Sequence, residues 1–283
     1  LNPKHSVRTI LTEALRVSQI TDPAGKTTLM AYDGRDNLVQ VTDPEGLKTT
    51  YSYNGFNELI QLISPDTGTS RYTQTASGQL KTKTDARQKV ATYNYDDLGR
   101  LLSVAYGDAT HTFSYDSAAN GVGKLATLTD ASGNTAYQYD TQGYVSQVRS
   151  QIGTTARTVG LSWTAAGQAA SLTYPSGIAI SYTRNAQGQL TGLLLNGSPL
   201  LDQIVWSGHV GAQSWRWSNG QVWARVGDDV GQIAGQTQAD GNRTYGYDQK
   251  DNIRRIEDLN APQRSQGLGY DNLDRLSSAA VGN

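Results

Sequence analysis

The sequence predicts an all-β protein, an array of β-hairpins that together form a curled, spiralling sheet. Three observations support this fold class. Of the 25 acidic residues only Glu13, Glu45, Glu58 and Glu257 are glutamates, which leaves 21 aspartates. Glutamate favours helices, whereas aspartate favours turns because its short side chain bonds nearby backbone amides. In addition, 30 of the 283 residues are glycines, and a pattern of turns and short apolar runs returns every 20–24 residues.

The stretch Tyr93–Val104, with the sequence YNYDDLGRLLSV, is the clearest copy of the repeating unit. Its two tyrosines are two residues apart, so a strand places them on one face. Asp96–Gly99 then supplies turn chemistry and ends on a residue that tolerates a positive φ. An apolar run restarts at Leu101. Together these features predict a β-hairpin.

The same phrase recurs in phase along almost the whole chain. We take Tyr95, the second tyrosine, as the anchor of its unit. The other anchor positions are occupied by Leu11, Tyr32, Tyr53, Gln74, Tyr115, Tyr139, Trp163, Arg184, Trp206, Gly227, Tyr247 and Tyr270. About thirteen units of 20–24 residues therefore cover residues 1–283, which we interpret as a single domain.

Two further positions keep phase with the anchor. Residues that adopt a positive φ at little energetic cost stand four positions after it. A type I turn followed by a left-handed residue requires such residues there. They are Asp36, Asn57, Gly78, Gly99, Gly143, Gly167, Gly188, Gly231, Asp251 and Asp274. Apolar residues stand six and nine positions after the anchor, for example Leu59 and Leu62. A spacing of three breaks strict alternation, so we expect a β-bulge between them.

A second turn follows eleven to fourteen residues after the anchor. Its clearest copies are Asp22–Gly25 and Asp43–Gly46, in which proline second and glycine fourth fit a type I turn. Each unit therefore holds two turns and two short strands. Ser117–Gly123 is expected to be an inserted loop. Residues 9–18 show helical periodicity but align equally well with a strand.

The segment Asn196–Ala224 is the least regular part of the array. Trp206, Trp215, Trp217 and Trp223 crowd it, and its glycine phase requires a one-residue shift at Gly211.

About 26 strands spaced ~4.8 Å apart would make a strip ~120 Å wide, and open sheets of that width twist and curl. Rolled into one hoop, the strip would be only ~40 Å across, which is part of a wall and not a roomy container. Tyrosine pairs such as Tyr51/Tyr53 are expected to stack between neighbouring units as cross-strand ladders.

Composition excludes several functional classes. A formal net charge of −1 gives no electrostatic case for binding nucleic acid or an anionic membrane. The chain has no cysteine, so a disulfide, a thiol nucleophile and a thiolate metal site are excluded. No apolar run is long enough to span a bilayer. The start Leu1–His5 has neither an initiator methionine nor a signal-peptide layout, so we expect a segment of a longer chain.

The unit Tyr-x-Tyr-Asp-x-x-Gly-x-Leu resembles the tyrosine–aspartate (YD) or Rhs repeat family. The likeness extends from about residue 11 to 279. It is carried by Tyr93–Leu101, Tyr137–Val145, Tyr245–Ile253 and Gly269–Leu276, by Tyr174–Gln189, and by the linking Asp-Pro phrases at Asp22 and Asp43.

The resemblance implies a β-shell. In Rhs-type polymorphic toxins, insecticidal toxin-complex B and C components and teneurins, such repeats form a strip that spirals into a hollow cocoon. In bacterial members the cocoon encloses a C-terminal toxin domain, which self-cleavage separates at the end of the core. That toxin domain is the implied partner. Secretion-apparatus components and an immunity protein are further candidates, and the implied location is outside the producing bacterium or at its surface.

The family's cleavage segment carries an Asp-Pro-x-Gly-Leu phrase, which Asp43–Leu47 matches in letters. Its phase is that of the ordinary linking turns, and further units follow it, so we interpret it as a turn. The true cleavage segment is expected beyond Asn283.

The residues that could carry chemistry have simpler structural explanations. His5, His111 and His209 lack ligand spacing for zinc. Gly121–Lys124 lacks the hydroxyl residue and upstream glycine of a phosphate loop. The aspartates could suggest a glycosidase pair or calcium sites, but their fixed turn positions already account for them. Asn196–Ser198 and Asn242–Thr244 are glycosylation sequons only in a eukaryotic secreted chain. We therefore assign no catalytic, cofactor-binding or metal-binding residue.

Two functions remain. The first is a non-enzymatic shell segment of a bacterial Rhs-type toxin that encapsulates a C-terminal toxin domain. The alternative is an extracellular recognition or adhesion module, teneurin-like or carbohydrate-binding, with an exposed aromatic row at Trp206–Trp223 as its site. Packing between units is the simpler explanation of the aromatic residues.

Overall fold

The computed structural model describes residues 7–208 and 211–282. These residues form 26 β-strands and one short 3₁₀ helix, η2 (Pro262–Arg264), so the all-β prediction is confirmed. The strands of the first half are β1 (Arg8–Leu11), β2 (Val17–Thr21), β3 (Thr27–Tyr32), β4 (Leu38–Thr42), β5 (Lys48–Tyr53), β6 (Leu59–Ser64), β7 (Gly68–Gln74), β8 (Leu80–Thr84), β9 (Val90–Tyr95), β10 (Leu101–Tyr106), β11 (Ala109–Tyr115), β12 (Leu125–Asp130) and β13 (Gly133–Tyr139).

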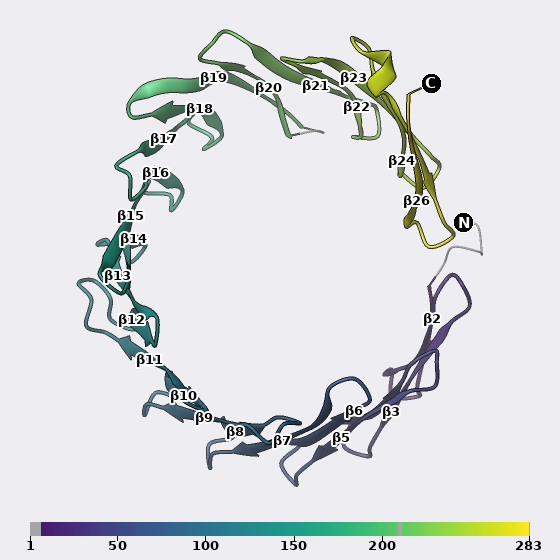
Figure 1. The fold of residues 1–283 in the computed structure, drawn as a ribbon, viewed down its shortest axis with the longest axis vertical. Helices are drawn as coiled ribbons and strands as arrows, with labels where there is room; N and C mark the ends of the chain where they lie inside the picture. Colours follow the sequence, from purple (N-terminus) through teal and green to yellow (C-terminus); the bar gives the residue numbers. More distant parts are fainter. Residues whose placement is uncertain (1–6, 209–210, 283) are drawn as a thin grey trace. The chain divides into compact units, whose positions relative to one another are not determined.

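The strands of the second half are β14 (Val145–Ile152), β15 (Thr155–Trp163), β16 (Ala169–Thr173), β17 (Ala179–Arg184), β18 (Leu190–Leu195), β19 (Ser198–Ser207), β20 (Gly211–Trp217), β21 (Val222–Gly227), β22 (Ile233–Gln238), β23 (Gly241–Tyr247), β24 (Ile253–Asp258), β25 (Gln266–Tyr270) and β26 (Leu276–Val281). Consecutive strands follow one another as antiparallel hairpins (Figure 1).

The chain divides into two compact units. One runs to Ala136 and includes Ser150–Thr155, and the other holds Tyr137–Arg149 and the residues from Ala156 onward. In the first, β1 to β13 pair in chain order, and in the second, β15 to β26 do so. The interpretation of residues 1–283 as a single domain stays a prediction.

The predicted bulge occurs in hairpin after hairpin at one position. In the β5–β6 hairpin, Tyr53 lies opposite Leu59 and Ser52 opposite Gln61, which leaves Ile60 as the extra residue. The β9–β10 hairpin repeats this arrangement with Leu102 as its extra residue. The spacing of three between the apolar residues is therefore the sequence signature of the bulge.

Both predicted turns have the expected geometry. In the first turn of the consensus unit, the amide of Gly99 donates to the carbonyl of Asp96, and Gly99 has a φ of 79°. The second turn at Asp22–Gly25 is built the same way, with a φ of 82° at Gly25. Leu15 (φ 59°) and Gln88 (φ 61°) hold the left-handed position of their turns without being glycine, asparagine or aspartate. A left-handed φ costs an L-residue with a Cβ about 1–2 kcal/mol.

The bulge and the strand alternation give each hairpin two different faces. The anchor face carries aromatic and aliphatic residues, such as Tyr51 opposite Leu62 and Tyr53 opposite Leu59. The opposite face carries small polar residues that bond across the hairpin. Such pairs are Thr73–Thr82, Asn94–Ser103, Ser114–Thr127 and Ser162–Ser171, at 2.6–2.9 Å.

The register changes one expectation about the tyrosines. They face aliphatic residues of their own hairpin and do not form the expected tyrosine ladder between units: Tyr51 lies opposite Leu62, and Tyr93 opposite Val104. Aromatic–aliphatic pairs of this kind contribute about 0.2–1 kcal/mol each.

Burial is shallow throughout the part of the chain that the structure describes. Its buried apolar residues are Ala91, Ala126, Leu201 and Ala261, and none of its large side chains is completely enclosed. The modest apolar composition is thus matched by a thin wall without a deep core.

Two local predictions can also be checked. Residues 9–18 contribute to strands β1 and β2, so the strand interpretation is right and the helical periodicity is incidental. Residues 117–123 form a loop between β11 and β12, as expected for an insertion. No helix within the described ranges is long and apolar enough to cross a membrane.

Candidate functional site

The anchor residues share a role that their packing alone does not explain. Ten of the thirteen, all in the described part of the chain, send a hydrogen-bond donor back to the preceding hairpin, to the carbonyl oxygen of the apolar residue six positions after that hairpin's anchor. Tyr53 Oη donates to Leu38 at 3.0 Å, and Tyr95 Oη donates to Leu80 at 2.9 Å. The same bond joins Tyr32 to Val17, Tyr115 to Leu101, Tyr247 to Ile233 and Tyr270 to Ile253.

The bulge creates the need for this bond. Pairing between β4 and β5 extends from Thr42–Lys48 to Gln40–Thr50, so the carbonyl of Leu38 lies beyond the end of the ladder. A backbone carbonyl removed from water without a partner destabilises the fold. The phenol of Tyr53 reaches this carbonyl and completes the contact between the two hairpins.

At four anchors tyrosine is replaced by a residue that carries a donor near the end of its side chain. Gln74 Nε2 donates to Leu59, Trp163 Nε1 to Val145, Arg184 Nη2 to Ala169 and Trp206 Nε1 to Leu190, at 2.7–3.3 Å. Where the anchor is Gly227, Arg225 takes over from two residues earlier, and its Nε donates to Ala212 at 2.7 Å. The position therefore requires a donor of suitable reach and not one residue type.

Burial perturbs several anchor phenols. Desolvation raises the pKa of Tyr53, with smaller contributions from Tyr51 and Asp33, and desolvation also raises the pKa of Tyr139 and Tyr247. A raised pKa keeps the phenol protonated, which preserves its donor over the physiological range.

The aspartate that follows the anchor is engaged in the turn. Asp96 Oδ1 accepts the amides of Leu98 at 3.0 Å and Arg100 at 2.8 Å, while Oδ2 accepts Arg100 Nε at 2.7 Å. The amide of Arg100, followed by its guanidinium, lowers the pKa of Asp96. An ionised, fully bonded carboxylate is a poor general acid, so Asp96 acts in the turn.

A second set of bonds joins consecutive turns. The residue five positions after one anchor donates to the residue four positions after the next. Where that acceptor is glycine, the carbonyl is used: Gln79 Nε2 donates to Gly99 at 2.8 Å. Where it is aspartate or asparagine, the side chain is used, as in Asn37 to Asn57 at 3.0 Å and Gln232 to Asp251 at 2.7 Å.

Arg100 makes the strongest of the contacts along this edge. Its two terminal nitrogens bind both carboxylate oxygens of Asp116 at 2.9 and 2.8 Å, and its guanidinium lies 4.5 Å from the centre of the Tyr115 ring. A bidentate pair of this kind fixes geometry as well as adding energy.

The three histidines give no metal site in the described ranges. His111 Nδ1 lies 3.8 Å from Asp130 Oδ2, and His5 and His209 fall outside the described residues. Within those ranges there is no group of three or more histidine, aspartate or glutamate side chains that could hold a metal ion.

The two motif-like phrases are turns. In the loop that contains Gly121–Lys124, Asp116 Oδ1 accepts the amide of Gly123 at 2.6 Å. This loop amide thus binds a carboxylate of the chain itself, whereas the amides of a phosphate loop bind phosphate. In Asp43–Leu47, the amide of Gly46 donates to the carbonyl of Asp43, and Gly46 has a φ of 85°. This is the geometry of the equivalent turn at Asp22.

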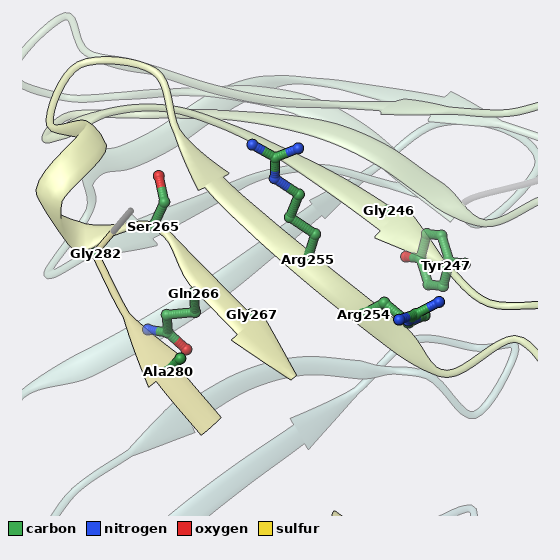
Figure 2. A pocket seen from close by; sticks show the side chains of 9 residues that line it. All are labelled: Gly246, Tyr247, Arg254, Arg255, Ser265, Gln266, Gly267, Ala280 and Gly282. Carbon is green, nitrogen blue, oxygen red and sulfur yellow. The ribbon is translucent and has the colours of Figure 1, made fainter. Parts of the chain in front are cut away.

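A shallow recess of about 480 Å³ lies over β23–β26 (Figure 2). The bulge in β24 places Arg254 and Arg255 side by side in its lining, with Gly246 and Gly267 on the neighbouring strands. Arg255 is paired with Glu257 at 2.6 Å. The lining combines small residues, arginines and Ser265 without a base–nucleophile pair, so it offers no catalytic arrangement.

Comparison with known proteins identifies the repeat. The RHS Repeat family matches residues 13–47, 32–69 and 75–111. Over these residues the chain is similar to RHS repeats. The hairpins beyond residue 111 continue the same anchor bond, as Tyr247 and Tyr270 show.

The fold of this chain is found in solved toxin-complex structures. A crystal structure of TcdB2-TccC3-Cdc42 matches with a TM-score of 0.82 and 18% identity, over 96% of this chain and 17% of that one. TcdB2-TccC3 without its hypervariable C-terminal region matches with a TM-score of 0.83 and 17% identity, over 99% and 17% of the two chains. The Tc holotoxin pore of Photorhabdus luminescens matches with a TM-score of 0.82 and 18% identity, over 99% and 17%.

The chain therefore spans about 17% of the length of these solved structures. No curated protein sequence matches it.

Proposed function

We propose that this RHS-repeat chain is a non-enzymatic shell segment of a bacterial Rhs-type toxin, and that the shell encloses a C-terminal toxin domain of the same parent protein. The observation that supports the proposal most is the anchor bond. Within each of the two units it makes each hairpin the support of the next, so neighbouring hairpins act as a continuous wall and not as independent modules.

The distribution of polar groups also favours a structural role. The recurring carboxylates, such as those of Asp96 and Asp116, are engaged by backbone amides and guanidinium groups that hold them ionised. The polar face presents hydroxyl and amide groups that bond to one another, for example Thr73 and Thr82. Such a surface gives an enclosed protein few apolar or charged sites to adhere to.

The proposed partner is the toxin domain of the parent chain. Secretion-apparatus components and an immunity protein would act on the parent outside this segment, and the parent would be delivered from the bacterial cell. The solved toxin-complex structures of the same fold support this assignment by analogy of fold.

The test uses the parent protein with its toxin domain attached. Three anchor phenols are removed together as Tyr53→Phe, Tyr95→Phe and Tyr247→Phe, which keeps the rings and deletes the donors. Protease sensitivity and activity of the toxin domain are then compared with those of the unmodified parent. We expect protection in the parent and exposure, with earlier activity, in the variant.

A matched control replaces Tyr51, Tyr93 and Tyr182 by phenylalanine. These tyrosines lie two residues before their anchors and are expected to leave protection unchanged. Deletion of the whole segment gives the extreme case. Equal toxin activity and equal protection with and without the segment would remove the shell proposal.

An extracellular recognition or adhesion module is the alternative function. It requires a surface for an external partner and no enclosed cargo. Unchanged cargo protection in the anchor variant, together with binding of the parent to a cell-surface partner through this segment, would favour it.

A further inference from the structure

The repeat is broken at β19–β21. The register of β19 against β20 shifts twice, between Asp202 and Val205 and again between Val205 and Trp206. Gln203, inside the strand, adopts a φ of 54°. A left-handed residue that is neither glycine nor asparagine is strained, and such strain and extra bulges concentrate where a side chain is re-aimed for function.

Three tryptophans lie next to this irregularity, and they have different roles. Trp215 stacks on Trp223 with ring centres 3.9 Å apart and planes at 13°. Trp217 meets Trp215 edge-on, with ring centres 6.2 Å apart. Trp217 is 37% exposed, whereas Trp215 and Trp223 are half-buried. The stacked pair therefore supports the sheet, and Trp217 is the ring of this group that a ligand can reach.

Trp217 lines a recess of about 410 Å³. Its lining residues are Pro199, Leu201, Asp202, Arg216, Trp217, Ser218 and Gly220. The charged members are paired: Arg216 Nε and Nη2 bind the two carboxylate oxygens of Asp202 at 3.0 and 2.9 Å. Arg216 lowers the pKa of Asp202, so the pair stays ionised and its charges cancel.

We propose that the recess around Trp217 binds the pyranose ring of a neutral saccharide. An indole face complements the C–H face of a sugar ring, while the neighbouring ion pair and turn supply donors and acceptors for hydroxyl groups. A lining without net charge gives no preference to a free anion or a quaternary ammonium. The volume fits a ring with its substituents, since small-molecule sites begin at about 300 Å³.

The inference is independent of the shell function, because it concerns binding by the chain itself. Tyr174 provides a matched control for it. Tyr174 begins the turn Tyr174–Gly177 in the same repeat phase in which Trp217 begins Trp217–Gly220, and each first residue accepts the amide of the turn's glycine at 2.9 Å. Tyr174 is 41% exposed, which closely matches Trp217.

The experiment is saturation-transfer NMR on the 283-residue chain. The probes are the methyl β-glycosides of glucose, galactose and N-acetylglucosamine, and a ten-residue proline-rich peptide is added as a competitor of another class. We expect transfer to at least one glycoside with a dissociation constant on the order of 1 mM. Trp217→Ala should weaken this binding at least about tenfold, whereas Tyr174→Ala should not change it.

A second readout avoids dependence on the folding of the alanine variant. The chain contains 5 tryptophans, so ¹⁵N spectra hold five indole N–H signals, and the signal lost in Trp217→Phe identifies Trp217. On titration with the bound glycoside that signal should shift, while the signal of Trp163, whose indole donates to Val145, should stay fixed. Absence of transfer from every glycoside, an unmoved Trp217 signal, or preference for the peptide would overturn the proposal.

Discussion

Replacing Tyr95 by phenylalanine removes one bond between neighbouring hairpins and leaves the aromatic ring in place. Tyr95 Oη donates to the carbonyl oxygen of Leu80 at 2.9 Å. Pairing between β8 and β9 stops at Thr82–Thr92, so this carbonyl has no ladder partner to replace the phenol. A net hydrogen bond contributes about 1 kcal/mol, and an orphaned buried carbonyl costs about 1–3 kcal/mol. Since this carbonyl is only partly shielded, we expect a loss of about 1–2 kcal/mol.

Urea unfolding measures the loss, and amide hydrogen exchange locates it. Stability in a repeat array is close to a sum over nearest neighbours. Faster exchange should therefore be confined to β8, β9 and β10, while amides in β22–β24 keep their rates.

The control is Tyr93→Phe, two residues away on the same strand. The Tyr93 ring faces Val104 across the hairpin, and its hydroxyl makes no hydrogen bond to any described residue. The free energy of unfolding of the Tyr93→Phe variant should differ from that of the unmodified chain by less than about 0.5 kcal/mol. Tyr95→Gln, which copies the natural Gln74, should retain most of the stability of the parent chain. Indistinguishable unfolding of Tyr95→Phe and Tyr93→Phe would refute the role given to the anchor donor.

Three further predictions concern the turns. Gly99→Ala should destabilise the chain by about 1–2 kcal/mol, and by more than Gly25→Ala does. Both glycines have a φ near 80°, but only at Gly99 would the new Cβ meet a neighbour, Gln79 Nε2 at 3.1 Å; equal urea midpoints would contradict this. Leu15→Gly should raise the free energy of unfolding by up to about 1 kcal/mol because it relieves a left-handed leucine, whereas Leu15→Ala should not; a lower urea midpoint for the glycine variant would exclude strain at this turn. Acid should unfold the chain, because hydrogen bonds, first of all from a backbone amide, lower the pKa of Asp85 from 3.8 to about 2. A carboxyl with a lower pKa in the folded state stabilises above its unfolded pKa, and that contribution is lost as the pH falls through the folded pKa. Urea midpoints should thus stay constant from pH 7 to about 5 and fall between about pH 4 and 2. Urea midpoints that stay constant down to pH 2 would contradict the stabilising role of ionised Asp85.

The hairpins could be predicted from sequence because their signals are local. The glycine four residues after Tyr95 and the spacing of three from Leu101 to Val104 are each fixed by the backbone of one hairpin. The turn and the bulge appear where those residues predict them. The insertion at residues 117–123 also leaves its signal in the local sequence.

The bonds between hairpins could not be predicted in the same way. The acceptor of Tyr95 is a backbone carbonyl of another unit, exposed by a bulge whose hydrogen-bond consequences are not visible in one strand. The residues that replace tyrosine at the anchor do carry one sign of these bonds in the sequence. Gln74, Trp163 and Arg184 look like failures of a tyrosine repeat, yet each carries an N–H donor near the end of its side chain.

The tryptophan cluster at Trp206–Trp223 is easy to find in the sequence, but the role of each ring cannot be predicted from it. Its four tryptophans are conspicuous in the sequence, but composition treats them alike. The structure separates Trp206, which serves as an anchor donor to Leu190, from the stacked Trp215 and Trp223 and from the accessible Trp217. Their roles depend on register within an irregular strand, which no periodic rule describes.

Gly227 gives the most informative case, because there the anchor side chain is absent and the bond remains. Arg225 supplies the donor to Ala212 from a different position, and its guanidinium also lies 5.6 Å from the centre of the Trp223 ring. A pure packing role for the anchor would leave a gap at Gly227 and would not require a donor in its place. The structure instead keeps the carbonyl bonded by another route, so the constraint on each unit is a satisfied carbonyl at its bulge. Tyrosine is the frequent solution because one side chain supplies both the apolar ring for the hairpin and the donor for its neighbour.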